Sequence, residues 1–310
     1  MVSPDIEPQV SIVVVCGPTG SGKGSLAREL ARRCDGEIIS ADSRKIYRGF
    51  DIGTAKPTHT QRALVEHHLI DCCDPEQLFS AAKFVDAADK IIAEIKNRNH
   101  NVFLVGGTGL YIRALLHGIV DTPSRDEKLR ADLLDIEVDN PGALYQQLAL
   151  VDPVLAKQLK PSDMIRIVRA LEVYKLCGRP LSEFQADHGF NQRRYPALLL
   201  SPNWERKKLY QRINSRVEHM LKAGLLEEVK SLLARGLGEC RAFKTVGYRE
   251  LKDHLAKKLT YEEAVEKIKT EHRRYSRRQV VWFKGIADLK WLPTPVDLDQ
   301  VSGDVKRFLT

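Results

Sequence analysis

The first third of the chain alternates between two hydrophobic patterns. Short apolar runs rich in β-branched residues, at 10–16, 37–40 and 101–105, have the composition of buried parallel strands. Between them, segments 26–34 and 84–95 carry apolar residues three and four positions apart, the spacing of a helix with one buried face. Strands that alternate with helices predict a parallel α/β sheet with helices on both faces.

The pattern changes after residue 120. From 121 to 190 the spacing is mostly helical and no strand run appears, whereas a strand pattern returns at 195–200. We therefore expect three parts. These are the first part of a sheet core at 9–120, a helical insertion at 121–190, and the second part of the core, with basic C-terminal helices, at 191–310.

The net charge of +8 on the 310 residues is concentrated in one region. Between Trp204 and Lys284 there are 21 Lys and Arg against 11 Asp and Glu, so the remainder of the chain is close to neutral. A run of charges on a helix often does no more than face solvent. The regional excess nevertheless favours a surface for a polyanion such as a nucleic-acid backbone.

Cysteine usage and hydropathy bear on the compartment. The six cysteines form no C-x-x-C pair and have no histidine at zinc-ligand spacing, so we expect reduced thiols. The first eight residues lack the basic start and apolar stretch of a signal peptide, and no apolar run is long enough to span a bilayer. We expect a cytoplasmic protein with no membrane partner.

The turn after the first strand carries a phosphate-binding motif. Residues 17–23 read Gly-Pro-Thr-Gly-Ser-Gly-Lys and fit G-x-x-x-x-G-K between a strand and a helix, the context that the motif requires. Its glycines let backbone N–H groups point at an anion, while the lysine and the helix N-terminus add positive charge. The predicted fold is therefore a P-loop NTPase-like parallel sheet. The predicted diphosphate or nucleotide ligands are Gly17, Pro18, Thr19, Gly20, Ser21, Gly22, Lys23 and Gly24.

One position departs from the usual P-loop. The lysine is normally followed by Ser or Thr, whose hydroxyl holds Mg²⁺, but here Gly24 stands in that place. Ser25 or Ser21 could substitute only with altered geometry, so the metal ligands stay open. A cradle for a diphosphate remains without that hydroxyl, whereas an ordinary ATP-dependent kinase becomes less favoured.

Three further residues are candidates for chemistry. Asp42 ends the second predicted strand, where it could act as a base beside the phosphate loop or equally cap a turn. Thr108 follows Gly106 and Gly107 at the end of the third, and we expect these glycines to let another molecule approach. Arg216 lies on a predicted helix, where it either meets solvent or neutralises a departing diphosphate.

The order of these motifs resembles the tRNA dimethylallyltransferase family, also called tRNA isopentenyltransferases. The resemblance covers about residues 11 to 285. Besides the phosphate loop and Asp42-Ser43, it rests on the segments Asp51-Ile-Gly-Thr-Ala-Lys-Pro57, His67-His-Leu-Ile-Asp71, Gly106-Gly-Thr-Gly-Leu-Tyr111, Arg166-Ile-Val-Arg-Ala-Leu-Glu-Val-Tyr174, Val246-Gly-Tyr248 and Arg278-Gln279 with Trp282.

The resemblance implies transfer of a dimethylallyl group from dimethylallyl diphosphate to N6 of the adenosine on the 3′ side of the tRNA anticodon. The partner would be the anticodon stem-loop of tRNA. We also expect Mg²⁺ as cofactor and a monomer. Asp42 would be the general base, Thr108 a further catalytic residue, and Arg216 the aid to diphosphate departure. The tRNA-binding residues it implies are Asp42, Ser43, Arg44, Lys45, Thr108, Arg130, Ile165, Arg166, Ile167, Val168 and Arg169. Lys45 and Ile165 often correspond to Gln in relatives.

Three alternatives remain open from the sequence. An isopentenyltransferase that acts on free AMP or ADP would share the core motifs. A P-loop kinase for a small metabolite would share the loop and the strands. An inactive relative that keeps only RNA affinity would be consistent with Gly24.

Overall fold

The computed structural model describes residues 10–190 and 192–310. The chain divides into two compact units. Met1–Leu116 and Arg194–Thr310 form the first, called the core unit below, and His117–Arg193 form the second, called the helical unit. No helix among the described residues is long and apolar enough to cross a membrane.

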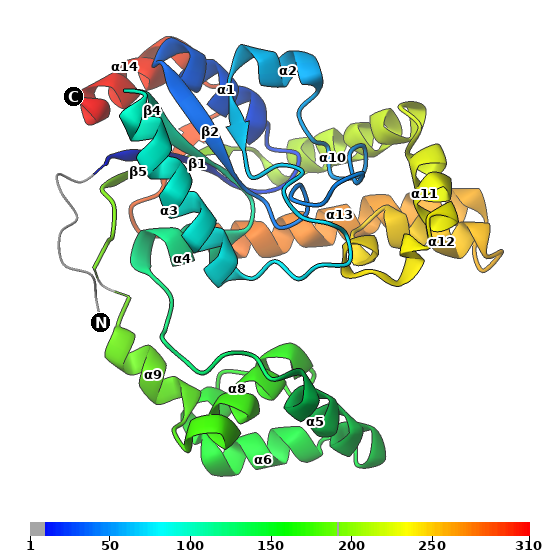
Figure 1. The fold of residues 1–310 in the computed structure, drawn as a ribbon. Helices are drawn as coiled ribbons and strands as arrows, with labels where there is room; N and C mark the ends of the chain where they lie inside the picture. The colour runs from blue at the N-terminus through cyan, green and yellow to red at the C-terminus, as the bar shows by residue number, and fades with distance from the viewer. Residues whose placement is uncertain (1–9, 191) are drawn as a thin grey trace. The chain divides into compact units, whose positions relative to one another are not determined.

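The core unit contains a six-stranded parallel sheet with the strand order β3-β2-β4-β1-β5-β6 (Figure 1). β1 lies between β4 and β5, and its residues pair in parallel register with both neighbours. The strands are β1 Ile12–Cys16, β2 Gly36–Ala41, β3 His67–His68, β4 Asn101–Gly106, β5 Ala197–Asn203 and β6 Lys290–Pro293. The prediction of a parallel α/β sheet from the sequence is thus confirmed.

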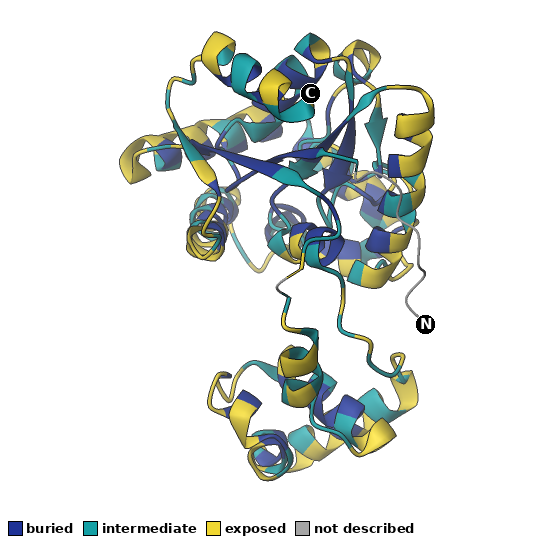
Figure 2. Ribbon diagram, turned by 90° about the vertical axis from the view of Figure 1, so that its left-hand side faces the viewer, coloured by how far each residue is buried: buried dark blue, intermediate teal, exposed yellow. Residues whose placement is uncertain are grey.

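Both faces of the sheet are covered, because alternate residues of a strand point to opposite sides. Val13 and Val15 of β1 pack against one pair of helices, whereas Ile12 and Val14 pack against the other pair. Figure 2 shows the strands as the most continuously buried part of the core unit. The first pair is α1 Lys23–Arg33 with α14 Leu298–Leu309, and the second is α3 Ala81–Asn97 with α4 Gly109–His117.

A second apolar cluster joins the basic C-terminal helices to the segment after β2. Phe50 of that segment packs with Phe243 and Tyr248 at ring-centroid distances of 6.1 and 4.8 Å. The helices around this cluster are α10 Arg206–Lys222, α11 Leu225–Ala234, η1 Leu237–Glu239, η2 Arg241–Lys244, α12 Tyr248–Leu255 and α13 Tyr261–Lys284, and the short α2 His59–Leu64 precedes β3. This packing places α10 and α13 beside the carboxyl end of the sheet.

The helical unit has its own small core. Leu144, Leu148, Ile167 and Leu171 are buried in it. Its described helices are α5 Glu127–Asp139, α6 Ala143–Val151, α7 Pro153–Ala156, α8 Met164–Cys177 and α9 Leu181–His188. The helical pattern that the sequence shows over this stretch therefore corresponds to helices in the structure.

Candidate active site

The phosphate loop connects β1 to α1 and depends on three glycines with left-handed backbone angles. The φ angles of Gly17, Gly20 and Gly22 are 135°, 81° and 85°, a region that other residues rarely adopt. A Cβ atom on Gly20 would also lie 2.7 Å from Cγ1 of Ile213 in α10. The loop conformation and its close contact with α10 therefore both require glycine.

Two side chains, one from α10 and one from the segment just before it, hold the loop through its carbonyl oxygens. Arg212 Nε donates to the carbonyl of Gly20 at 3.0 Å, and Trp204 Nε1 donates to that of Ser21 at 2.8 Å. The guanidinium of Arg212 also lies 4.3 Å from the centre of the Trp204 ring. The N–H groups of Gly20, Gly22 and Lys23 have no hydrogen-bond partner among the described residues, so they are available to an anion.

Gln279 of α13 ties the phosphate loop to the loop after β4. Its Oε1 accepts the N–H of Thr19 at 2.8 Å, and its Nε2 donates to the carbonyl of Gly107 at 2.8 Å. A Cβ on Gly107 would lie 2.3 Å from that Nε2, and one on Gly106 would lie 2.0 Å from the carbonyl oxygen of Ala41. The expectation that these glycines admit another molecule is therefore wrong, because the chain's own atoms fill the space.

Asp42 and Thr108 lie in neighbouring turns at the carboxyl ends of β2 and β4. Oδ1 of Asp42 accepts the backbone N–H groups of Arg44 at 2.9 Å and Lys45 at 3.4 Å. The Thr108 hydroxyl accepts the N–H of Ser43 at 3.0 Å. Among the described residues, the second carboxylate oxygen of Asp42 has no hydrogen-bond partner. Asp42 thus fills the turn role that we weighed and still presents one oxygen for chemistry.

A cavity of about 410 Å³ brings the phosphate loop and Asp42 together. It is lined by Thr19 and Lys23 of the loop, by Asp42, and by Arg216 of α10. Thr108 is not among its lining residues. Its charged lining comprises seven Lys or Arg residues and two acidic ones, so it suits a strongly anionic ligand. The basic residues are Lys23, Arg44, Lys45, Arg216, Lys244, Arg249 and Arg278, and the acidic ones are Asp42 and Glu271.

Burial is the main cause that lowers the pKa values of three of these cations, and repulsion between them adds to it for Lys23 and Lys45. Burial and repulsion from Lys45 lower the pKa of Lys23 to about 7, although Asp42 opposes this shift. Burial lowers the pKa of Lys45 to about 8, again against the attraction of Asp42, and burial also lowers the pKa of Arg216. These positive groups are held close together without enough negative charge, and a bound polyanion would relieve that repulsion.

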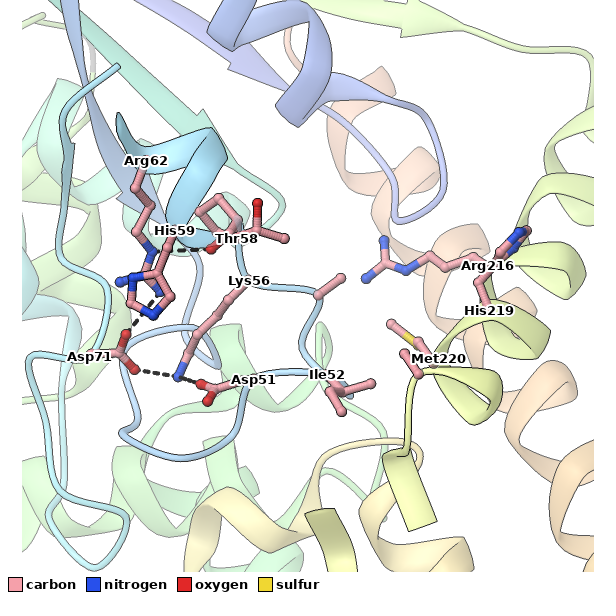
Figure 3. Close-up of a pocket in the computed structure, with 13 residues that line it drawn as sticks. Asp51, Ile52, Lys56, Thr58, His59, Arg62, Asp71, Arg216, His219 and Met220 are labelled. Atoms are coloured by element: carbon pink, nitrogen blue, oxygen red, sulfur yellow. Dashed lines mark hydrogen bonds and ion pairs between the residues drawn. The ribbon is translucent and has the colours of Figure 1, made fainter. Parts of the chain in front are cut away.

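Arg216 also faces a neighbouring cavity of about 520 Å³, where Figure 3 shows it projecting from α10 toward the open space. Its Nε is buried and has no hydrogen-bond partner among the described residues. On another wall of this cavity, Lys56 forms ion pairs with Asp51 and Asp71. The motif around Asp51 and Lys56 is therefore held by its own charges, whereas the guanidinium of Arg216 remains available to a ligand.

The remaining predicted RNA-binding residues belong to the helical unit. Arg130 makes a two-point ion pair with the buried Glu172, at 2.7 and 2.9 Å, and Arg169 binds the same carboxylate. Ile165 is 80% exposed, and Arg166 is exposed and paired with Asp163. The side chains of two other predicted residues, Ile167 and Val168, pack in the core of the unit and do not face solvent.

Several residues of the cavity were missed because no local pattern marks them. Gln279 and Val246 belong to segments that support the family resemblance, yet we assigned them no role from the sequence. Lys244, Arg249 and Tyr275 were visible only as part of a basic region.

His67 and His68, which form β3, have contacts within the chain. His67 Nδ1 lies 2.6 Å from the carbonyl oxygen of Val65, and His68 Nε2 lies 2.6 Å from a carboxylate oxygen of Glu37.

Comparisons with known proteins identify the family of the chain. The model of a family described as IPP transferase matches residues 45–286. The chain is 50% identical over 283 residues to tRNA dimethylallyltransferase 1 of Syntrophotalea carbinolica. The aligned region covers 91% of this chain and 90% of that relative. The chain belongs to the IPP transferase family.

Solved structures of IPP transferases share the fold. A tRNA isopentenylpyrophosphate transferase from Bacillus halodurans has a TM-score of 0.71 at 37% identity and covers 97% of each chain. A eukaryotic dimethylallyltransferase that acts on tRNA has a TM-score of 0.81 at 30% identity, with 96% of this chain and 77% of that chain covered. The P-loop-like fold and the transferase assignment both follow, and a metabolite kinase is not favoured.

Proposed function

We propose that this IPP transferase moves a dimethylallyl group from dimethylallyl diphosphate to N6 of the adenosine on the 3′ side of a tRNA anticodon. The observation that carries the proposal is one cavity lined by the phosphate-loop lysine, by Asp42 and by Arg216. These three groups match the needs of the reaction. A diphosphate must be bound, a proton must be accepted, and negative charge must be stabilised as the leaving group departs.

The donor would bind through its diphosphate. The free N–H groups of Gly20, Gly22 and Lys23 and the start of α1 would hold the phosphoryl oxygens, with the Lys23 ammonium beside them. Arg216 would bind the same oxygens from α10, since its Nε lacks a protein partner. These contacts strengthen as the ester bond breaks, because negative charge then builds on the diphosphate.

The acceptor amine needs a base, since its lone pair is delocalised into the purine ring. As the allylic carbon leaves its diphosphate oxygen and bonds to N6, one N6 proton would pass to the free carboxylate oxygen of Asp42. General-base catalysis of this kind typically contributes about 10²–10⁴-fold to the rate. Thr108, which bonds to Ser43, would keep the turn that aims this oxygen.

Mg²⁺ is the metal that the proposal includes. No group of three or more His, Cys, Asp or Glu among the described residues could hold a metal, and Gly24 offers no hydroxyl. The few protein oxygens near the phosphate loop fit an ion that is bound mainly by the substrate, since Mg²⁺ usually takes one or two carboxylates plus phosphate oxygens and water. Asp42, which lines the cavity together with Lys23, would be the protein carboxylate that could hold it. Ser25 is a less suitable candidate, because its hydroxyl is exposed and accepts from Arg28 at 3.4 Å. When bound, the ion would neutralise charge on the diphosphate.

The tRNA would bind to the basic surfaces of the chain. An adenine stacked within the anticodon loop is inaccessible to a cavity, so it must be extruded before reaction. In the core unit, Ser43, Arg44 and Lys45 adjoin the proposed base, and in the helical unit Arg130, Ile165, Arg166 and Arg169 remain proposed tRNA contacts. We further propose a monomeric enzyme in the cytoplasm, where tRNA and reduced thiols are found.

The test is a transfer assay with labelled dimethylallyl diphosphate and an unmodified tRNA that has adenosine beside its anticodon. The label should appear in N6-isopentenyladenosine after nucleoside analysis, and the reaction should require Mg²⁺. Parallel reactions should contain AMP in place of tRNA, or a tRNA with guanosine at that position. Transfer to AMP at the same efficiency, or none to any acceptor, would overturn the proposal.

A further inference from the structure

A third cavity, also in the core unit, adjoins the phosphate loop but takes no part in the proposed transfer. It measures about 510 Å³ and lies between Pro18, the end of β5, the start of α10, α13 and β6. Ser276 and Val280 of α13 line it, whereas Tyr275 and Gln279 line the cavity that contains Asp42. The two cavities therefore lie against different faces of the same helix.

Aromatic side chains form much of the lining. Trp204, Tyr210 and Trp291 each contribute to it and each remains partly exposed. Their partly exposed faces are open to a ligand that enters the cavity. Rings in such a position provide stacking surfaces for a flat ligand.

The charged side chains around these rings are all positive. Arg206, Arg277 and Lys284 line the cavity and are exposed, and no acidic side chain is among the described residues that line it. Arg206 also lies over the Tyr210 ring at 5.2 Å. The cavity thus combines flat apolar surfaces with a positive rim, a combination that suits an aromatic ring carrying negative charge.

Ser276 supplies an independent indication of a polar ligand. It lies within α13 with 0% of its surface exposed, and its hydroxyl has no hydrogen-bond partner among the described residues. An unpaired buried hydroxyl is unfavourable, and most buried polar groups in folded proteins have a hydrogen-bond partner in the protein or in ordered water. Ser276 lines this cavity, where a ligand could supply that hydrogen bond.

We propose that this cavity binds a nucleotide unit, with its base among the three rings and its phosphate against Arg277 and Lys284. The volume lies within the range of about 300–1,000 Å³ common to small-molecule sites, which is more than a lone phosphate needs. A purely apolar ligand would leave Ser276 and the positive rim unpaired. The same chemistry is offered by a free mononucleotide and by an unpaired nucleotide of an RNA chain.

The first arm of the test uses guanosine monophosphate, which has a large stacking surface but no N6 amine to accept a prenyl group. Saturating pyrophosphate keeps the phosphate loop occupied, and binding is followed by tryptophan fluorescence, since two of the three tryptophans line the cavity. The double variant Arg277→Gln/Lys284→Gln and the variant Tyr210→Ala should each weaken binding at least tenfold, and Ser276→Ala about threefold. Arg274→Gln, an exposed residue of α13 outside the cavity, is the matched control and should bind normally.

The second arm measures binding of a fluorescent, unmodified anticodon stem-loop to the same variants without donor. If the variants bind the stem-loop at least tenfold more weakly and the unaltered protein does not bind guanosine monophosphate, the ligand is a nucleotide of the RNA. If the variants bind guanosine monophosphate more weakly but bind the stem-loop normally, the ligand is a free nucleotide. Normal thermal unfolding of the charge variant shows that it folds, as its two side chains are exposed. The proposal is overturned if no variant affects either probe, or if inorganic phosphate binds as tightly as the nucleotide. Neither arm requires transfer activity, so the result stands apart from the proposed function.

Discussion

Gln279 and Thr19 are 260 positions apart in the chain, yet the side-chain oxygen of Gln279 accepts the backbone N–H of Thr19 at 2.8 Å. The nitrogen of the same amide donates to the carbonyl of Gly107. One side chain on the basic helix α13 therefore connects the loop that would hold the donor to the loop after β4. A single amide is suited to this position because it offers one donor and one acceptor in fixed geometry.

Replacing that amide should damage both the fold and the donor site. Gln279→Leu leaves two buried backbone groups unpaired, at about 1–3 kcal/mol each, so we expect a clear loss in the free energy of unfolding. Gln279→Glu keeps the acceptor for Thr19 but places a second oxygen against the Gly107 carbonyl and adds negative charge. It should weaken donor binding more than tenfold. Urea unfolding and donor titration measure the two effects.

The exposed Arg274 on the same helix provides a control for these measurements. Arg274→Gln should leave unfolding and donor affinity close to those of the unaltered protein. A Gln279→Leu variant of normal stability and normal donor affinity would show that the bridge has no function.

Asp42 has a turn role and a proposed chemical role, and two substitutions separate them. Asp42→Asn keeps the oxygen that accepts from Arg44 and Lys45 but cannot take a proton. Asp42→Ala loses both functions. We expect both variants to lose about 10²–10⁴-fold in the single-turnover transfer rate, and only the alanine variant to lose about 1 kcal/mol of stability. Rapid transfer by the Asp42→Asn variant would assign the base elsewhere.

The sequence predicted the parts of the site that depend on local patterns. Gly17 to Lys23 could be recognised because the motif and its flanking strand and helix are contiguous, and strand polarity then placed Asp42 at the same edge of the sheet. Gln279 could not be predicted, since its partners are set by how α13 packs. Gly106 and Gly107 were misinterpreted for the same reason, because a glycine pattern does not reveal which atoms approach it.

The helical unit shows a similar limit. Helical spacing predicted α8, but spacing alone could not tell that Arg130 and Arg169 bind a buried carboxylate. Glu172 lies within the segment 166–174 that supports the family resemblance, but nothing in the sequence indicated that its carboxylate binds these arginines. Only the packed structure shows that Glu172 joins these arginines in one charge network.

Removing Glu172 should therefore destabilise the helical unit. Burial opposes its ionisation, but hydrogen bonds from Arg130, Arg169 and the N–H of Asp126 outweigh burial and lower the pKa of Glu172 to about 2. Glu172→Ala removes the carboxylate that pairs with Arg130 and leaves Arg169 with only its neutral partners, Thr122 and the carbonyl of Pro123. We expect a loss of about 3–5 kcal/mol. Hydrogen exchange of amides in α8 measures it.

The sign of the pH dependence follows from the lowered pKa. The stabilisation is present above about pH 4.5 and is lost as the pH falls toward 2, because the unfolded chain then binds the proton first. Glu183→Ala is the matched control, since its ion pair with Arg179 is exposed and contributes about 0–1 kcal/mol. Equal effects of the two substitutions would refute the structural role of Glu172.

Donor binding should depend on the protonation of Lys23. With a pKa near 7, this side chain is charged below pH 7 and neutral above it in the free protein. A bound diphosphate favours the ammonium, so binding above pH 7 takes up a proton, and affinity should fall by up to about tenfold per pH unit between 7 and 9. Lys45, whose pKa is about 8, acts in the same direction.

Calorimetric titration with dimethylallyl diphosphate, without tRNA and in buffers of different ionisation enthalpy, counts the protons taken up. Its terminal phosphate ionises near pH 6, so it contributes little in this range. In Lys45→Met the remaining uptake belongs to Lys23, and it should occur at higher pH because the repulsion from Lys45 that helps to lower the pKa of Lys23 is gone. Adding Lys23→Met to this variant should abolish the uptake together with most of the affinity. A pH-independent affinity in Lys45→Met would contradict the assignment.

Gly24→Thr tests how the protein manages without the usual P-loop hydroxyl. A Cβ at Gly24 would lie 3.6 Å from Nη1 of Arg28, an ordinary contact, and Gly24 has no left-handed φ, so the fold should accept the change. If Mg²⁺ is held mainly by the diphosphate, the added hydroxyl supplies a ligand that the native protein lacks. The Mg²⁺ concentration for half-maximal transfer should then fall several-fold, while the maximal rate changes little.

Gly24→Ala adds the Cβ without the hydroxyl and should leave the Mg²⁺ requirement unchanged. A transfer rate that rises from nearly zero only in Gly24→Thr would instead mean that the native chain is an RNA-binding relative without activity.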